Sequence, residues 1–338
     1  MFYTKKFLAV VFSIVMIFPL LVSCGQGDKG TKGLEFHPLS DGTYGVSAGD
    51  ALYLEEIVIP AKHKGKAVTQ IVSEAFKGAD NLKKITIPDT ITSVGKDAFL
   101  DCKELDDVYT SNLEAWLKIT YKNGNGHPNF YGELHILDEK GNEFTEIVIP
   151  DSITKIDDYM FANCKSLTSV TFSENGNLTK IGVYAFKNCK KLKSITFPDS
   201  VTSIGAYAFE GSGLESITVT NGVTSIYGGE FIGCTELTSV IIQDGVTSLG
   251  DLMFRDCSKL TSIVIPDSVT EIGVSTFKNC SSLSAVYYGG TKSDWNGISI
   301  SNVYNEALTS ATRYYYSETQ PTKSGNYWRY VDGVPTVW

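Results

Sequence analysis

One sequence pattern repeats along almost the whole chain. The stretch ITFPDSVTSIGAYAF (195–209) has close copies in ITIPDTITSVGKDAF from Ile85, IVIPDSITKIDDYMF from Ile147 and IVIPDSVTEIGVSTF from Ile263. A phenylalanine marks the same position in each copy, usually 23 residues after the previous one: Phe76, Phe99, Phe161, Phe186, Phe209, Phe231, Phe254 and Phe277. A period this short makes each copy one structural unit of a single elongated domain.

No copy holds enough apolar residues to fold alone. One copy has these apolar positions: Leu192, Ile195, Phe197, Val201, Ile204, Ala208 and Phe209. Burying so few side chains does not offset the entropy of ordering a whole copy, so neighbouring copies must share one core. Residues 192–197 alternate as a short strand, 198–200 predict a turn, and 206–210 are long enough for one helical turn. Stacked copies therefore predict a parallel sheet in a right-handed solenoid.

The repeat can be written Leu-x-x-Ile-x-Ile-Pro-Asp-Ser-Val-Thr-x-Ile-Gly-x-x-Ala-Phe-x-x-Cys, and about nine copies lie between residues 54 and 288. This motif resembles the BspA-like, or Treponema pallidum-type, leucine-rich repeat family. The resemblance implies an α/β repeat solenoid, with a parallel sheet on one face and short helical turns opposite. It also implies a non-enzymatic surface protein of a host-associated microbe.

Two segments depart from the repeat. We assign residues 42–288 to the solenoid and expect an irregular excursion at 106–142, because VYTSNLEAWLKI (108–119) resembles VYYGGTKSDWNGI (286–298). The alternating residues around Gly141 and Asn142 predict a hairpin that returns to the solenoid. Residues 289–338 are rich in aromatic residues and carry a second hairpin signal at Asp332-Gly333, so we expect a β-rich C-terminal cap.

The N-terminus is typical of an exported protein. Two lysines precede an apolar run at 7–22, which is short for a membrane-spanning helix. Leu21-Val22-Ser23-Cys24 resembles a bacterial lipobox, which implies a signal peptide at 1–23 and lipidation of Cys24. The Gly-rich segment 24–41 then predicts a flexible tether. Plain secretion and a retained anchor are the alternatives to a lipid anchor on the cell surface.

The charge balance excludes one class of partner. Removing residues 1–23 takes away two lysines and no acids, so the formal charge falls from −9 to −11. An acidic chain without a basic cluster is poorly suited to nucleic acid or to an anionic membrane surface. Contact with the membrane is therefore expected through the lipid anchor only.

Six cysteines follow the repeat phenylalanine by three residues: Cys102, Cys164, Cys189, Cys234, Cys257 and Cys280. We expect buried reduced thiols that act as small apolar residues. Disulfides between the cysteines of neighbouring coils are the alternative. A column of acidic residues follows the strands at Asp89, Asp151, Asp199, Asp244 and Asp267. Turn capping and calcium binding are both compatible with this column, and capping is the simpler interpretation.

No catalytic set converges in the sequence. Gly45-x-Ser47-x-Gly49 matches the nucleophile elbow of hydrolases, but it precedes a solenoid and lacks the surrounding α/β sheet. There is no phosphate-binding loop, dinucleotide fingerprint or zinc-protease motif. We therefore predict no enzyme activity, no metal and no cofactor.

The outward positions of the strands are the candidate ligand-binding residues. They are Ser194, Thr196, Ser216, Thr218, Ser239, Ile241, Ser262, Val264 and Tyr287. The expected partner is an extracellular protein, and the expected role is adhesion or protein recognition; the resemblance implies proteins of a host or of neighbouring cells. Serine and threonine also suit a solvated strand without any ligand, which is the structural alternative.

Aromatic residues outside the core positions support a second hypothesis. They gather in the excursion and the C-terminal segment and include Trp116, Tyr121, Trp295, Tyr314–Tyr316, Tyr327, Trp328 and Tyr330. Exposed aromatic rings can stack on sugars, which would make the protein a glycan-binding surface lipoprotein. Packing within the cap explains the same residues without a ligand.

Overall fold

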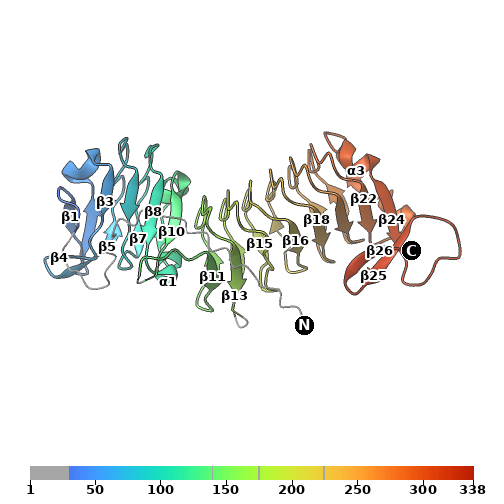
Figure 1. Ribbon diagram of the computed structural model, residues 1–338, viewed down its shortest axis with the longest axis horizontal. Helices are drawn as coiled ribbons and strands as arrows, with labels where there is room; N and C mark the ends of the chain where they lie inside the picture. The colour runs from blue at the N-terminus through green and yellow to red at the C-terminus, as the bar shows by residue number, and fades with distance from the viewer. Residues whose placement is uncertain (1–29, 139, 174–175, 224) are drawn as a thin grey trace, which may run out of the picture.

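The protein is described by a computed structural model covering residues 30–338 apart from 139, 174–175 and 224. The predicted signal peptide and Cys24 lie outside the described residues. The chain forms one row of stacked coils that runs from the N-terminal to the C-terminal end of the molecule (Figure 1). The repeat therefore builds a parallel-sheet solenoid, as predicted.

One side of the solenoid carries the longer strands. They are β3 (Glu56–Val58), β6 (Lys84–Thr86), β8 (Asp107–Thr110), β10 (Glu133–Ile136), β11 (Glu146–Ile149), β13 (Ser169–Phe172), β16 (Ser216–Val219), β18 (Ser239–Ile242), β20 (Ser262–Ile265), β22 (Ala285–Tyr288) and β24 (Thr312–Tyr316). The pairing is parallel from β3 to β10, from β11 to β13 and from β16 to β24. Between β13 and β16, the coil that contains Ile195 is joined to its neighbours by single parallel bridges, Val170 to Ile195 and Thr196 to Thr218. We call this side the strand face.

A second side carries shorter strands, most of them two residues long. They are β7 (Ser93–Val94), β9 (Thr120–Tyr121), β12 (Lys155–Ile156), β14 (Lys180–Ile181), β15 (Ser203–Ile204), β17 (Ser225–Ile226), β19 (Ser248–Leu249), β21 (Glu271–Ile272) and β23 (Ser299–Ile300). At the N-terminal end this side continues into β2 (Tyr44–Ser47) and β5 (Lys66–Ile71), and β4 (Lys62–His63) pairs antiparallel with β5.

The third side of each regular coil consists of turns, so the predicted helical turns are wrong. Two residues per coil have positive φ, for example Tyr184 (56°) and Asn188 (58°), or Leu252 (62°) and Asp256 (62°). The left-handed conformation costs a non-glycine residue about 1–2 kcal/mol, and a residue that adopts it cannot continue a right-handed helix. The described helices are short and lie outside the regular coils: η1 (Gly49–Tyr53), α1 (Leu113–Leu117), η2 (Gly124–Gly126), η3 (Pro128–Phe130), α2 (Lys292–Trp295) and α3 (Glu306–Ser310).

The repeat phenylalanines form the centre of the core. Each is completely buried, and consecutive rings stack with centroids 5.2 Å apart for Phe186 and Phe209 and 5.6 Å apart for Phe231 and Phe254. The backbone N–H of Phe186 also donates to the carbonyl of Ala208 in the next coil, at 2.7 Å. Each coil is thus completed by its neighbours, as the shared-core prediction requires.

The repeat cysteines are free and buried, and each thiol donates to a main-chain carbonyl of the preceding coil. The acceptors are Phe76 for Cys102 (3.0 Å), Leu134 for Cys164 (3.3 Å), Phe161 for Cys189 (3.2 Å), Phe209 for Cys234 (3.1 Å), Phe231 for Cys257 (3.2 Å) and Phe254 for Cys280 (3.1 Å). Burial raises the pKa of Cys102 to about 12 and that of Cys234 to about 11. The cysteine position therefore adds a hydrogen bond between coils, which a purely apolar residue could not supply.

The predicted tether at 24–41 is too long. Residues 35–38 form β1 (Glu35–Pro38), which pairs antiparallel with β2. Phe36 stacks on His63 with ring centroids 3.8 Å apart and nearly parallel planes. This contact fixes residues that composition alone marks as flexible.

The excursion at 106–142 is also more regular than predicted. β8 and β10 lie in the parallel sheet of the strand face, so the segment adds a coil to the stack. Trp116 is buried within it and donates its indole N–H to the carbonyl of Met160 at 3.1 Å. The expected hairpin is reduced to a tight turn, with an antiparallel bridge between Leu137 and Glu143. The strand face breaks between β10 and β11, where Figure 1 shows a step in the row of coils.

The C-terminal segment continues the stack before it departs from it. β24 pairs in parallel with β22, so residues 289–316 form one more coil. β25 (Tyr327–Val331) then pairs with β24, and β26 (Val334–Val337) pairs antiparallel with β25 across Asp332 and Gly333. We call β25 and β26 the C-terminal hairpin.

We predict that Phe209→Ala lowers the free energy of unfolding by about 3–5 kcal/mol, because it removes a fully buried ring that stacks on both neighbours. Thr196→Ala, at an exposed position of the same coil whose hydroxyl has no described hydrogen bond, is the control and should change it by less than about 0.5 kcal/mol. Urea unfolding followed by circular dichroism measures both. Equal effects from the two substitutions would contradict a core shared between coils.

We further predict that the six repeat thiols do not react in the folded protein. In a Cys24→Ser variant, Ellman's reagent at pH 8 should label them slowly, since their burial blocks access and raises the thiol pKa. All six should react at once in concentrated guanidinium. Rapid labelling under native conditions would show that the coils do not close around the cysteines.

Candidate binding surface

The structure places most of the predicted ligand-binding residues on the strand face. Ser194, Thr196 and Ser216 are exposed, and five others are half-buried with their neighbours on the sheet. Those five are Thr218, Ser239, Ile241, Ser262 and Tyr287. The residues form a flat file because parallel pairing keeps Ser216, Ser239 and Ser262 in register.

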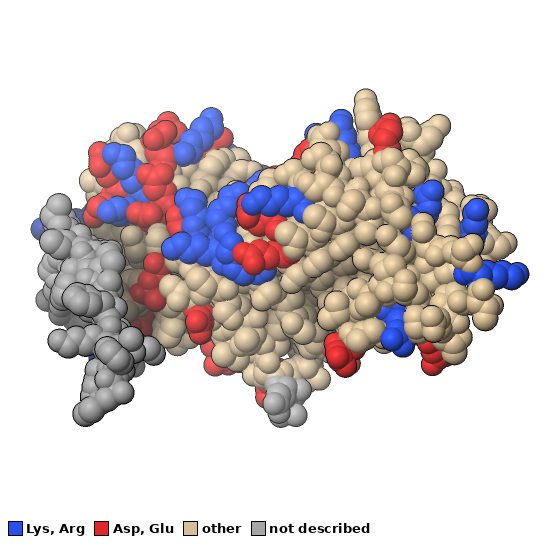
Figure 2. All heavy atoms as spheres, turned by 45° about the vertical axis from the view of Figure 1, so that its right-hand side comes forward, with Lys and Arg blue, Asp and Glu red and all other residues tan. Residues whose placement is uncertain are grey.

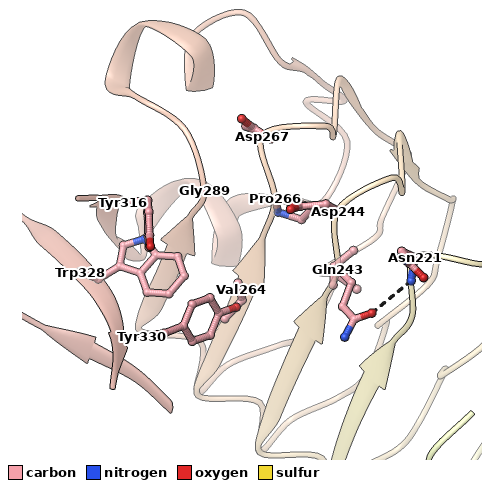
Figure 3. A pocket seen from close by; sticks show the side chains of 11 residues that line it. Asn221, Gln243, Asp244, Val264, Pro266, Asp267, Gly289, Tyr316, Trp328 and Tyr330 are labelled. Atoms are coloured by element: carbon pink, nitrogen blue, oxygen red, sulfur yellow. Dashed lines mark hydrogen bonds between the residues drawn. The ribbon is translucent and has the colours of Figure 1, made fainter. Parts of the chain in front are cut away.

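Val264 is the exception, since it is only 5% exposed. The prediction of an exposed apolar position is wrong here, because residues of the C-terminal hairpin lie beside Val264 at the end of the strand face (Figure 3). Tyr287 also contacts the C-terminal hairpin, since its ring centroid lies 5.5 Å from that of Trp328. On the neighbouring strand β24, the ring of Tyr314 stacks on it with centroids 5.4 Å apart. The apolar end of the file is therefore packed against aromatic residues that follow it in the chain.

Trp328 anchors the C-terminal hairpin. Its side chain is 1% exposed, and its indole N–H donates to the carbonyl of Tyr288 at 2.8 Å. Its ring lies 5.3 Å from that of Tyr316, 4.9 Å from that of Tyr330 and 5.5 Å from that of Tyr287. At the end of the chain, Trp338 donates its indole N–H to the carbonyl of Ser317 at 2.8 Å. These contacts hold Tyr316 and Tyr330 in fixed positions.

A groove of about 690 Å³ lies between the C-terminal hairpin and the strand face. Its polar residues follow successive strands: Asn221 after β16, Gln243 and Asp244 after β18, and Asp267 after β20. Figure 3 shows these side chains on one side of the groove and the rings of Tyr316, Trp328 and Tyr330 on the other. The carboxyl ends of parallel strands meet at one edge, which is why residues 23 positions apart converge. We call this the C-terminal groove.

The acids of the C-terminal groove are available for contact with a ligand. Asp244 and Asp267 are exposed, and within the described residues neither carboxylate forms an ion pair or a hydrogen bond. The turns close through the backbone instead, as when the N–H of Val269 donates to the carbonyl of Pro266 at 3.3 Å. The turn-capping interpretation of the acidic column therefore finds no support at these positions. Burial raises the pKa of Tyr330, and the nearby Asp244 carboxylate adds to that rise.

Some charged side chains elsewhere form ion pairs between coils. Lys187 contacts Glu210 at 3.2 Å, and Lys193 contacts Glu215 at 3.0 Å. Figure 2 shows lysine and arginine gathered in one region with acidic side chains among them, while a broad area of the same face carries neither sign. Exposed pairs of this kind contribute less than about 1 kcal/mol each to stability, so the coils do not depend on them for stacking.

The motif at Gly45–Gly49 does not form a nucleophile elbow. Ser47 lies within β2 and is absent from the residues with positive φ, whereas an elbow needs a strained turn. Its hydroxyl does lie 2.8 Å from Nε2 of His37. His37 precedes the motif, however, whereas the histidine of an α/β-hydrolase triad follows the serine in the chain. Among the described hydrogen bonds, none joins His37 to a carboxylate, so no triad is assembled. This arrangement cross-links β1 and β2.

A column of stacked tyrosines on the turn side was not predicted. Tyr159, Tyr184 and Tyr207 each stand two residues before the repeat phenylalanine, and consecutive rings lie 5.0 Å apart. All three have φ between 56° and 60°, which is unusual for a bulky side chain. The spacing of the tyrosines was visible in the sequence, but their shared backbone conformation was not.

Trp116 of the excursion and Trp295, its counterpart in the C-terminal segment, pack inward, whereas Phe130 of the excursion is 41% exposed. Trp116 is 1% exposed and Trp295 is 6% exposed, so neither can present its ring to a ligand. This removes the two tryptophans from the glycan hypothesis and leaves Phe130 of the excursion and the exposed tyrosines of the C-terminal groove. Tyr316 and Tyr330 are 41% and 44% exposed.

In the part of the chain that the structure describes, no three His, Cys, Asp or Glu side chains are placed to hold a metal ion. Over the same residues, no helix has the length and apolar character needed to span a membrane.

The repeat profile described as BspA type Leucine rich repeat region matches the chain in six copies, over residues 50–123, 139–179 and 175–284. The chain belongs to this family. The matched segments together make up more than half of the sequence, and they coincide with the stacked coils. A search of curated proteins finds no match to the chain.

Several solved structures are similar to this BspA-type protein. A leucine-rich repeat protein of T. pallidum is 21% identical, covering 75% of this chain and 89% of its own, with a TM-score of 0.33. A leucine rich cell surface protein of Faecalibacterium prausnitzii is 24% identical, with coverage of 80% and 96% and a TM-score of 0.35. A leucine-rich repeat protein of Eubacterium ventriosum is 21% identical, with coverage of 76% and 82% and a TM-score of 0.42.

We predict that Trp328→Ala releases the C-terminal hairpin, because it removes the hydrogen bond to Tyr288 and the central aromatic contact. Limited proteolysis should then cleave within residues 317–338 while the rest of the chain remains intact. Val334→Ala, at a 61% exposed position of the same hairpin, is the control and should leave the cleavage pattern unchanged. A wild-type pattern for Trp328→Ala would mean that the anchor lies elsewhere.

Proposed function

We propose that this BspA-type protein is a non-enzymatic recognition protein of the bacterial cell surface. Its strand face binds an extracellular protein, in adhesion or in a related recognition process. The chain is exported through a signal peptide at 1–23 and held at the membrane by lipid on Cys24, which leaves the solenoid outside the cell.

The observation that carries this proposal is the flat file of outward residues on the strand face. Ser194, Thr196 and Ser216 are exposed, uncharged and in register with residues of the adjoining coils. A rigid surface of small side chains lets a partner approach closely and loses little side-chain entropy on binding. Repetition over several coils also extends the surface toward the area that a stable protein interface needs.

The export part of the proposal comes from the sequence. A basic start, an apolar run too short to span a membrane and Leu21-Val22-Ser23-Cys24 occur in the order that lipoprotein export requires. One acyl chain gives only weak membrane binding, so stable attachment needs further lipid on Cys24.

The test is binding of the full chain to extracellular matrix proteins, with substitutions on the strand face. We predict that Thr196→Arg combined with Thr218→Arg weakens binding at least about tenfold, because two bulky charges then project from the file. Surface plasmon resonance against immobilised fibrinogen, fibronectin and collagen measures the effect.

The matched control is Thr202→Arg combined with Thr247→Arg. Both residues are exposed and stand next to two-residue strands on the other side of the solenoid, so binding should not change. Equal loss for both pairs, or no binding to any of the three proteins, would count against the strand face as the recognition surface.

A further inference from the structure

We propose that the C-terminal groove is a binding site for a neutral saccharide. The site is distinct from the flat file on the strand face, and it adds a small-molecule ligand class to protein recognition. The argument rests on the size of the groove, on its exposed aromatic rings and on the chemistry of its polar residues.

The groove has the size of a ligand pocket. Its volume of about 690 Å³ lies within the range of roughly 300–1,000 Å³ that is usual for small-molecule sites. One lysine or arginine side chain of a bound peptide would fill only a small part of this volume and leave the rest to water. A disaccharide fills it better, and the open side of the groove lets a longer glycan extend into solvent.

Two tyrosine rings are held at the groove without being buried. Tyr316 and Tyr330 are 41% and 44% exposed, although both contact the buried ring of Trp328. Each of the two rings contacts Trp328 on one side and leaves much of its surface open to solvent. A fixed and accessible aromatic face is what stacks against the apolar C–H face of a sugar ring, with little entropy lost on binding.

The opposite side of the groove supplies hydrogen bonds in both directions. Carboxylates at Asp244 and Asp267 accept from sugar hydroxyls, and the side-chain amide of Asn221 can both donate and accept. The oxygen of Gln243 already accepts from the backbone N–H of Asn221 at 3.2 Å (Figure 3), which holds the Gln243 amide in place with its NH₂ group as the donor. These residues come from the ends of successive strands, so they are spaced by about one coil step of 4.8 Å. Such a row can contact several hydroxyls of one ligand at once.

The charges at the groove select against acidic ligands. Its lining contains two carboxylates and neither lysine nor arginine. Sialylated, uronic and sulfated glycans would meet this negative potential without a compensating cation. A cationic peptide would use the carboxylates but not the two amides, so the full set of residues favours a neutral, polyhydroxylated ligand.

The test is a glycan array probed with the full chain. The array carries neutral hexose and N-acetylhexosamine oligosaccharides beside sialylated and sulfated ones. We predict binding to neutral glycans only, with the best of them then measured by titration calorimetry. Tyr330→Ala and Asp244→Asn should each weaken that binding at least about tenfold, since one removes an aromatic face and the other an ionised acceptor.

Two controls make the result specific. Tyr330→Phe keeps the ring and should retain most of the affinity, which shows that binding depends on the ring and not on the hydroxyl. The proteolysis pattern of Tyr330→Ala, compared with that of Trp328→Ala, shows whether the hairpin is still docked when binding is lost. Tyr227→Ala changes a tyrosine that is 66% exposed and not among the groove residues, so binding should be unaffected.

Three outcomes would overturn the proposal. They are no binding to any neutral glycan, unchanged binding in Tyr330→Ala, and retention of an arginine-rich peptide that Asp244→Asn abolishes. None of these concerns the strand face, so the proposal can fail while protein binding by Thr196 and Thr218 stands, and the reverse also holds.

Discussion

The stacking of one coil on the next is the interaction on which the rest of this structure depends. A coil has one phenylalanine at its centre, and the ring of Phe209 is buried between the rings of Phe186 and Phe231 in the neighbouring coils. Thiols and backbone N–H groups add hydrogen bonds across the same interface, as from Cys257 to Phe231. Stability is therefore a property of neighbouring pairs, and local changes in one coil are tolerated when the interface is kept.

The same stacking produces the candidate binding surfaces. Parallel pairing repeats each outward position at one coil step, which turns Ser216, Ser239 and Ser262 into a continuous file. It also brings the residues after each strand to one edge, where Gln243 and Asp267 face the hairpin across the C-terminal groove. A flat file suits a protein partner and a groove with exposed rings suits a small ligand, so one fold offers two kinds of candidate site.

The ends and irregular coils limit what periodicity can predict. Residues 106–142 lack the repeat motif, yet their strands β8 and β10 join the sheet because their backbone can pair and Trp116 fills the core. Positions in the turns were predicted as helical, although the second residue after each repeat phenylalanine, such as Asn188, is Gly, Asn or Asp, the types that favour the left-handed conformation. The other left-handed position has no such sign, since a tyrosine stands there at Tyr184. One signal for the groove was present: Gln243 stands where other copies carry proline.

The sequence by itself determined the period, the apolar core positions and the buried thiols. These depend on contacts between equivalent positions of adjacent copies, which the spacing of the repeat already specifies. Only the tertiary structure decided that Val264 is covered and that Tyr316 and Tyr330 stay exposed beside Asp244. That outcome depends on how Trp328 docks on Tyr288, a contact across 40 residues that no repeat encodes.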